Sequence, residues 1–194
     1  MRGRDETEDE IEEPRKRTRV GQLANRQCLD WMVVSGNCHY ARDQSSFKTY
    51  RPITRQVKNN IFNPYDELHV TGVGTVELEV CKSPQDLSSH IIVLENVLHI
   101  PEAICNGFNP LLYGSSMSCN QDYWEGGDTS GNPVWFSTPF AGGTKLVLAG
   151  NPQGESEMIQ GREYALCLYV SPDEWESILA PEDGVNGHAN AMES

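Results

Sequence analysis

The feature that most constrains the fold is a repeating layout of short apolar or alternating segments, each bounded by glycine, proline, serine or asparagine. Thr75–Cys81 (TVELEVC) alternates apolar and polar residues, which is the period of a half-buried strand. His90–Ile100 is the most apolar segment, and its β-branched residues and the following Pro101 favour a strand over a buried helix. Many short strands between Gly-rich turns predict an all-β barrel or sandwich. Further strands are expected at 29–34, 68–70, 134–136, 145–149 and 164–170.

Between two of these strands lies Gly72-Val73-Gly74, for which we expect a tight turn or a bulge. A nucleotide-binding glycine loop is a poor match, because the third glycine and a following helix are both missing. We expect the segment 42–50 to be a loop or a single helical turn, and the segment 114–133 to be a long loop or a hairpin.

The sequence divides into four parts. Residues 1–24 are charged and nearly free of large apolar side chains, so we expect a disordered arm. Residues 25–170 carry the predicted strands and form the β-barrel domain. A short C-terminal α-helix, expected over 171–181, packs on the barrel, and residues 182–194 form a disordered tail.

The predicted helix has a clear start and stop. Ser171 is a good N-cap, Pro172 suits the first helical position and Glu174 completes a capping box. Pro181 ends the helix. One face carries the side chains expected to dock on the barrel, which are Trp175, Ile178 and Leu179.

Charge and cysteine usage exclude several function classes. The formal net charge of −13 repels phosphate backbones, so we expect no nucleic-acid partner for the acidic barrel. No apolar run is long enough for a membrane span, and the charged start is not a secretory signal. The six cysteines are widely spaced in a long chain without a signal, which indicates reduced thiols in an intracellular protein, cytoplasmic or nuclear. No C-x-x-C pair is present, so a zinc knuckle or ribbon is not expected. We expect no metal site and no cofactor. The run Arg15–Arg19 is either a nuclear-localisation patch or part of a solvated arm.

The segment 31–41, WMVVSGNCHYA, is the most informative motif. An apolar run enters a Ser35-Gly36 turn and leaves with His39. This is the outline of an aspartic-protease motif, Asp-Ser/Thr-Gly, with Val34 where the Asp belongs.

Two further stretches complete a family resemblance. VTGVGTVEL at 70–78 and LENVLHIPEAICN at 94–106 follow the first motif in the family order. The three stretches resemble the β-barrel, protease-like domain of copia-type (Tnt-type) retrotransposon Pol polyproteins and its stand-alone fungal descendants. The resemblance implies a mainly β fold, a retropepsin-like closed or nearly closed β-barrel. It also implies structural roles for the motif residues Trp31, His39, Gly72, Gly74, Asn96 and Pro101.

Val34 matters because of the chemistry that the family uses. A retropepsin brings together two carboxylates, one from each subunit, that share a proton and act as base and acid. Valine neither holds a charge nor accepts a proton, so we expect peptide hydrolysis to be lost and no catalytic residue to remain. The turn itself is retained by Ser35 and Gly36.

Other residues are weaker candidates for chemistry. Asp30 shares the strand face of Val34 but lies about 13 Å away along the strand. The run 128–131 (DTSG) imitates the motif but follows two glycines, which indicates a turn. Cys38 and His39 suggest a thiol–imidazole couple, yet neighbours on a strand point to opposite faces. A metal site from Cys28, Cys38 and His39 lacks the usual ligand spacing.

Three functions follow from these observations. The first is a transposon-derived, non-catalytic β-barrel that serves as an interaction module or is a remnant. The second is a residual hydrolase that uses an unrecognised group beside Val34. The third is a nuclear regulatory protein that uses the Arg15–Arg19 patch. A protein partner is possible but not identified, and the chain is expected to be a monomer or a homodimer.

Overall fold

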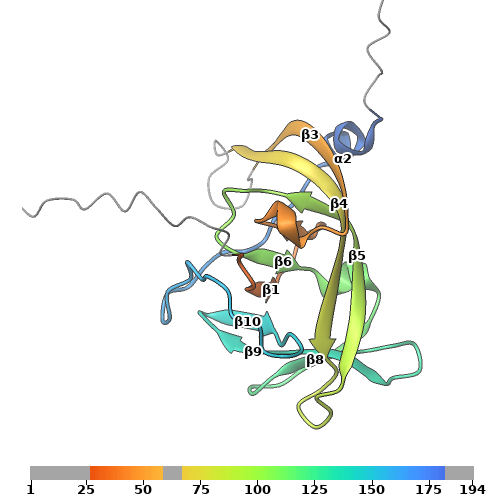
Figure 1. Ribbon diagram of the computed structural model, residues 1–194, viewed down its shortest axis with the longest axis vertical. Helices are drawn as coiled ribbons and strands as arrows, with labels where there is room; N and C mark the ends of the chain where they lie inside the picture. The colour runs from red at the N-terminus through yellow and green to blue at the C-terminus, as the bar shows by residue number, and fades with distance from the viewer. Residues whose placement is uncertain (1–26, 59–66, 182–194) are drawn as a thin grey trace, which may run out of the picture.

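The computed structural model describes residues 27–58 and 67–181. The predicted arm 1–24, the Arg15–Arg19 patch and the tail 182–194 therefore lie outside the described residues. The described part is mainly β, as predicted, and Figure 1 shows its long strands running the length of the molecule.

The strands occupy the following positions: β1 Trp31–Val33, β2 Tyr40–Ala41, β3 Thr49–Lys58, β4 Glu67–Cys81, β5 Ser89–His99, β6 Asn106–Phe108, β7 Ser116–Cys119, β8 Trp124–Gly127, β9 Pro133–Phe140 and β10 Gly143–Leu146. The helices are a 3₁₀ turn η1 at Gln44–Ser46, a single-turn α1 at Pro110–Tyr113 and α2 at Pro172–Leu179.

The ten described strands form one sheet, in the order β3-β4-β5-β2-β6-β1-β10-β9-β8-β7. The sheet does not close on itself, because β3 and β7 each have a strand neighbour on one side only. The mainly β class is thus confirmed, whereas the closed barrel is not.

Gly72 and Gly74 lie inside one continuous strand, β4, so the predicted division into two strands with a turn is wrong. The alternative, a bulge in this segment, is not found either, because Gly72, Val73 and Gly74 pair in register with β5. The neighbouring bulge belongs to β5: Gly74 pairs with Val97 and Val76 with Leu94, which leaves Glu95 and Asn96 opposite Thr75. Glycine is needed at position 74 because a Cβ there would lie 1.9 Å from the carbonyl oxygen of Thr49 on β3.

The core has two parts on the two faces of β1. Met32 packs into a first cluster with Val34, Tyr40 and Leu98, and Trp31 packs into a second cluster with Trp135, Phe108 and Leu94. Successive side chains of a strand point to opposite faces, so both faces of β1 are buried. This agrees with the prediction of a buried strand at 29–34.

The segment 164–170, predicted as a strand, belongs to no strand of the sheet. It is an extended segment that forms a single parallel bridge, between Leu168 and Gly36. We call residues 166–171 the strap, because they cross over the loop that follows β1.

The C-terminal helix is confirmed, with Ser171 and Glu174 forming the predicted capping box. α2 lies beside β3 (Figure 1), where Arg51 and Arg55 donate hydrogen bonds to the last carbonyl groups of the helix. Ile178 is buried as expected, but Leu179 is about half exposed, because α2 covers only the edge of the sheet. No helix in the described ranges is long and apolar enough to cross a membrane.

Candidate functional site

Val34 directly follows β1 and is a core residue. It is only 6% exposed and belongs to the first core cluster. Its backbone N–H donates to the carbonyl oxygen of Phe108 at 2.9 Å, which continues the parallel pairing of β1 with β6. The Val34 side chain therefore packs among the apolar side chains of this cluster.

The turn after Val34 is in contact with the strap. Gly36 has a φ of +106°, and its backbone pairs with Leu168. A Cβ at Gly36 would lie 2.0 Å from the Leu168 carbonyl oxygen. Only glycine allows this close approach of two backbones.

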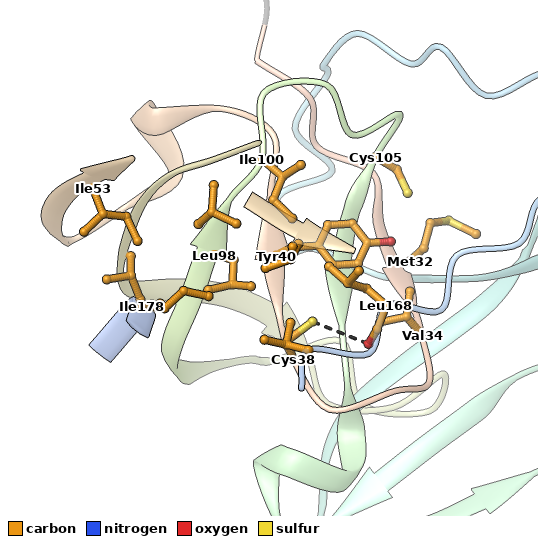
Figure 2. Close-up of a cluster of buried hydrophobic side chains, with 14 of the residues drawn as sticks. Met32, Val34, Cys38, Tyr40, Ile53, Leu98, Ile100, Cys105, Leu168 and Ile178 are labelled. Carbon is orange, nitrogen blue, oxygen red and sulfur yellow. Dashed lines mark hydrogen bonds between the residues drawn. The ribbon is translucent and has the colours of Figure 1, made fainter. Parts of the chain in front are cut away.

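Asn37 fixes the strap by two hydrogen bonds with one residue. Its side-chain amide donates to the Val170 carbonyl oxygen at 2.7 Å, and its side-chain oxygen accepts the Val170 N–H at 2.8 Å. The Tyr40 hydroxyl donates to the Leu166 carbonyl oxygen at 3.1 Å. Figure 2 shows the thiol of Cys38 directed at the carbonyl oxygen of Leu168. The chain thus covers its own motif loop with the strap.

His39 holds the other side of the loop. Its ring stacks on Phe108, and its Nδ1 accepts the backbone N–H of Asn109 at 3.1 Å. Burial lowers the pKa of His39 to about 4. The imidazole is therefore neutral at pH 7, with Nδ1 occupied by the amide.

The titratable groups that pack with Val34 are kept neutral by burial. Burial raises the pKa of the Cys38 thiol to about 12, and it raises the pKa of Tyr40 well above its ordinary value. Cys38 and His39, the suggested thiol–imidazole couple, are engaged with different partners, the strap and Asn109.

Asp30 and Asp128, the two other acids named from the sequence, do not lie beside Val34. The carboxylate of Asp30 accepts a hydrogen bond from Lys145 on β10 at 2.9 Å. Asp128 lies on an exposed turn, where its side chain accepts the N–H groups of Ser130 and Asn132. In the part of the chain that the structure describes, no group of three His, Cys, Asp or Glu side chains could hold a metal ion.

The remaining motif residues do not gather at one site. Trp31 lies in the second core cluster, and Gly72 and Gly74 lie along β4. Asn96 forms the β5 bulge with a φ of +52°, and Pro101 lies in the turn after β5.

Two residues of the site were missed by sequence reasoning. Asn109 is fully buried: its side-chain amide donates to the Gly36 carbonyl oxygen at 3.0 Å, and its side-chain oxygen accepts the N–H of Leu111. The Asn109-Pro110 dipeptide has the pattern of a helix start and would have indicated α1. Asn37 gave no local signal, because its partner Val170 is 133 positions away.

The comparison with known families bears on this loop directly. Residues 31–111 match the family model described as the Pol polyprotein, beta-barrel domain. The matched segment runs from β1 into α1 and contains Val34, His39 and Asn109. The strap lies outside it. A search of curated proteins and a search of solved structures each found no match. The Pol polyprotein resemblance is confirmed, and its copia-type and fungal details stay predictions.

Proposed function

We propose that the chain is a domain derived from a copia-type transposon Pol polyprotein that has lost peptide hydrolysis and acts as a non-catalytic interaction module. One observation carries the proposal. Val34 stands where the motif needs an Asp, and the strap of the same chain lies over the loop that carries it.

The chemistry of the loop supports this function. A retropepsin-type reaction needs two carboxylates that share one proton, one as base on water and one as acid on the carbonyl. Valine supplies neither. Asp30, the nearest acid in the described sequence before the motif, is held by Lys145.

The strap also bears on the oligomeric state. In a retropepsin-like dimer, the motif loops of two subunits meet at the active site. Here the backbone of Gly36 and the side chain of Asn37 are engaged by Leu168 and Val170. We therefore propose a monomer with respect to this surface.

A protease assay tests the proposal. The purified chain is incubated with peptides of polyprotein cleavage-site type, with and without pepstatin, and the products are followed by mass spectrometry. We expect no pepstatin-sensitive cleavage. Such cleavage by the unaltered chain would show that the proposed loss of activity is wrong.

Two variants distinguish the effect of lacking a carboxylate at position 34 from the effect of the strap that covers the loop. Val34→Asp restores the carboxylate, but the strap remains, so we expect the variant to stay inactive and to be less stable, because the new acid is buried. Val34→Ile is the apolar control, and its extra methylene group in a packed core is expected to cost about 1–3 kcal/mol. If Val34→Asp gains pepstatin-sensitive activity, the strap does not block the site and that part of the proposal fails.

A further inference from the structure

A groove of about 440 Å³ lies between β5, α1, α2 and the loop before β2. Its lining combines apolar and polar side chains, among them Val93, Glu95, Asn96, Leu112, Trp175 and Leu179. Asn37, Cys38 and His39 of the motif loop also line the groove, whereas Val34, Ser35 and Gly36 do not.

One wall of the groove is an open strand edge. β5 pairs with β4 from Ser89 to His99, but β2, on its other side, pairs only with Leu98 and His99. Among the described residues, no strand pairs with the 89–97 stretch of that edge. From Ser89 to Leu94, every second backbone N–H and C=O points to the open side, where it can pair with an added strand, and the bulge at Glu95 and Asn96 ends this regular stretch.

The edge is open because the chain leaves it just before β2. β2 runs parallel to β5, with Tyr40 opposite Leu98. The residues before Tyr40 do not continue along β5, because Asn37 is held by Val170 and Cys38 is directed at Leu168. Across the groove, α1 supplies Leu112 and Tyr113. The gap therefore has strand-pairing groups on one wall and apolar side chains on the other.

The exposed side chains beside the groove are apolar and acidic. Ile91 and Val93 on β5 are exposed, and they lie opposite Glu79 and Glu77 on β4. Glu95 follows on the same strand and lines the groove.

These charges indicate the kind of partner. Lys48 pairs with Glu77, whereas Glu79 and Glu95 have no ion-pair partner within residues 27–58 and 67–181. Such a surface favours a partner with basic side chains. A second copy of this chain, with its net charge of −13, is disfavoured by repulsion.

We propose that the groove binds an extended peptide with alternating basic and apolar side chains, which adds to the open edge of β5 as a further strand. Backbone pairing supplies affinity in this mode, and the side-chain pockets supply specificity. The basic side chains of the peptide lie on the same face of the sheet as Glu95, and its apolar side chains, on the other face of the added strand, lie toward α1, which supplies Leu112 to the groove. This inference deepens the proposed function and rests on it in one respect, since the bound peptide is not cleaved.

Binding is measured by fluorescence anisotropy with the full chain and a labelled peptide of alternating Lys and Val, about eight residues long to span the open edge. We expect saturable binding that weakens about tenfold in Glu95→Lys, since the reversed charge repels the peptide. Asp122→Lys makes the same change of charge on an exposed loop away from the groove, and we expect it to bind like the unaltered chain. A Glu/Val peptide serves as the control ligand and is expected not to bind.

Two N-methylated peptides test the backbone pairing. One is methylated on every odd amide and the other on every even amide, so that only one of them loses the N–H groups that face β5. We expect one peptide to lose binding and the other to keep it. Equal behaviour of the two peptides, or equal binding by Glu95→Lys and Asp122→Lys, overturns the proposal.

The two proposals fail in different ways. Peptide that binds and is cleaved contradicts the loss of protease activity but leaves the groove assignment intact. Absence of binding, with no cleavage, overturns the groove assignment alone. Sedimentation of the chain without peptide tests whether a second copy of the chain fills the groove instead. A dimer that dissociates in Glu95→Lys would show that it does, which also overturns the proposal.

Discussion

At the scale of single residues, His39 couples the motif loop to pH. Its Nδ1 accepts the Asn109 N–H, and burial lowers its pKa from 6.5 to about 4. Between these values the unfolded chain binds a proton that the folded chain does not. The free energy of unfolding therefore falls as the pH drops through this window, by up to about 3 kcal/mol from this group. Urea unfolding at pH 7 and at pH 4.5 measures the change.

His39→Gln is the control for this effect. Its side-chain oxygen can still accept the Asn109 N–H, but it does not titrate. We expect a flatter dependence of stability on pH than in the unaltered chain. Carboxylates titrate in the same acidic range in both proteins, so the difference between the two curves reports His39. Identical curves would contradict the assignment.

A second residue-scale prediction concerns the Asp30–Lys145 ion pair. The Asp30 side chain is 9% exposed and that of Lys145 31%, and Lys145 also lies over the Phe140 ring. One oxygen of Asp30 has no hydrogen-bond partner, so the ion pair with Lys145 is the main interaction that offsets the burial of this carboxylate. Lys145→Met leaves the carboxylate buried and unpaired, and we expect a loss of about 2–3 kcal/mol in urea unfolding.

The double variant Asp30→Asn/Lys145→Met provides the matched comparison. It removes both charges, so it should be more stable than Lys145→Met alone. A double variant less stable than Lys145→Met would show that the charge of Asp30 is not what destabilises the single variant.

At the scale of elements, the strap depends on Asn37. Asn37→Ala removes both hydrogen bonds to Val170 and leaves two backbone groups without partners, at an expected cost of about 2–3 kcal/mol. Hydrogen exchange should become faster at the Val170 amide. Asn37→Asp keeps the acceptor but sets a carboxylate oxygen against the Val170 carbonyl oxygen, so we expect it not to restore stability. Unchanged exchange at Val170 in Asn37→Ala would mean that the strap is held by other contacts.

The elements that were predicted correctly are those with a local signal. β5 has an apolar β-branched run with a proline stop, and α2 has its own capping box. β3 was missed because its polar edge sequence includes Pro52, and β2 and β6 are too short to show a period. The strap looked like a strand by composition, but it pairs only at Leu168.

The same limit applies to the candidate site. Val34 could be found because the residues around it form a local motif. The strap that covers it could not be predicted, because the contact between Asn37 and Val170 joins residues 133 positions apart. The open edge of β5 likewise depends on where β2 stops, which is decided by tertiary contacts of the loop before Tyr40.

At the scale of the whole molecule, β4 joins the two core clusters. Val70 and Val73 pack in the first cluster, and Val76 and Val80, further along the same strand, pack in the second. If either cluster came apart, half of β4 would lose the side chains that it packs against. We therefore expect the described residues to unfold as one cooperative unit.

The six free cysteines can report this cooperativity. Cys119 is exposed on the edge strand β7 and should react with a thiol reagent at once, and Cys167, half exposed on the strap, should follow. The buried thiols should react together at the rate of global unfolding; these are Cys28, Cys38, Cys81 and Cys105. Labelling followed by mass spectrometry measures each rate. Since Cys38 lies under the strap, its separate early reaction would show that the strap opens alone and exposes the loop of Val34, which would contradict a single cooperative unit.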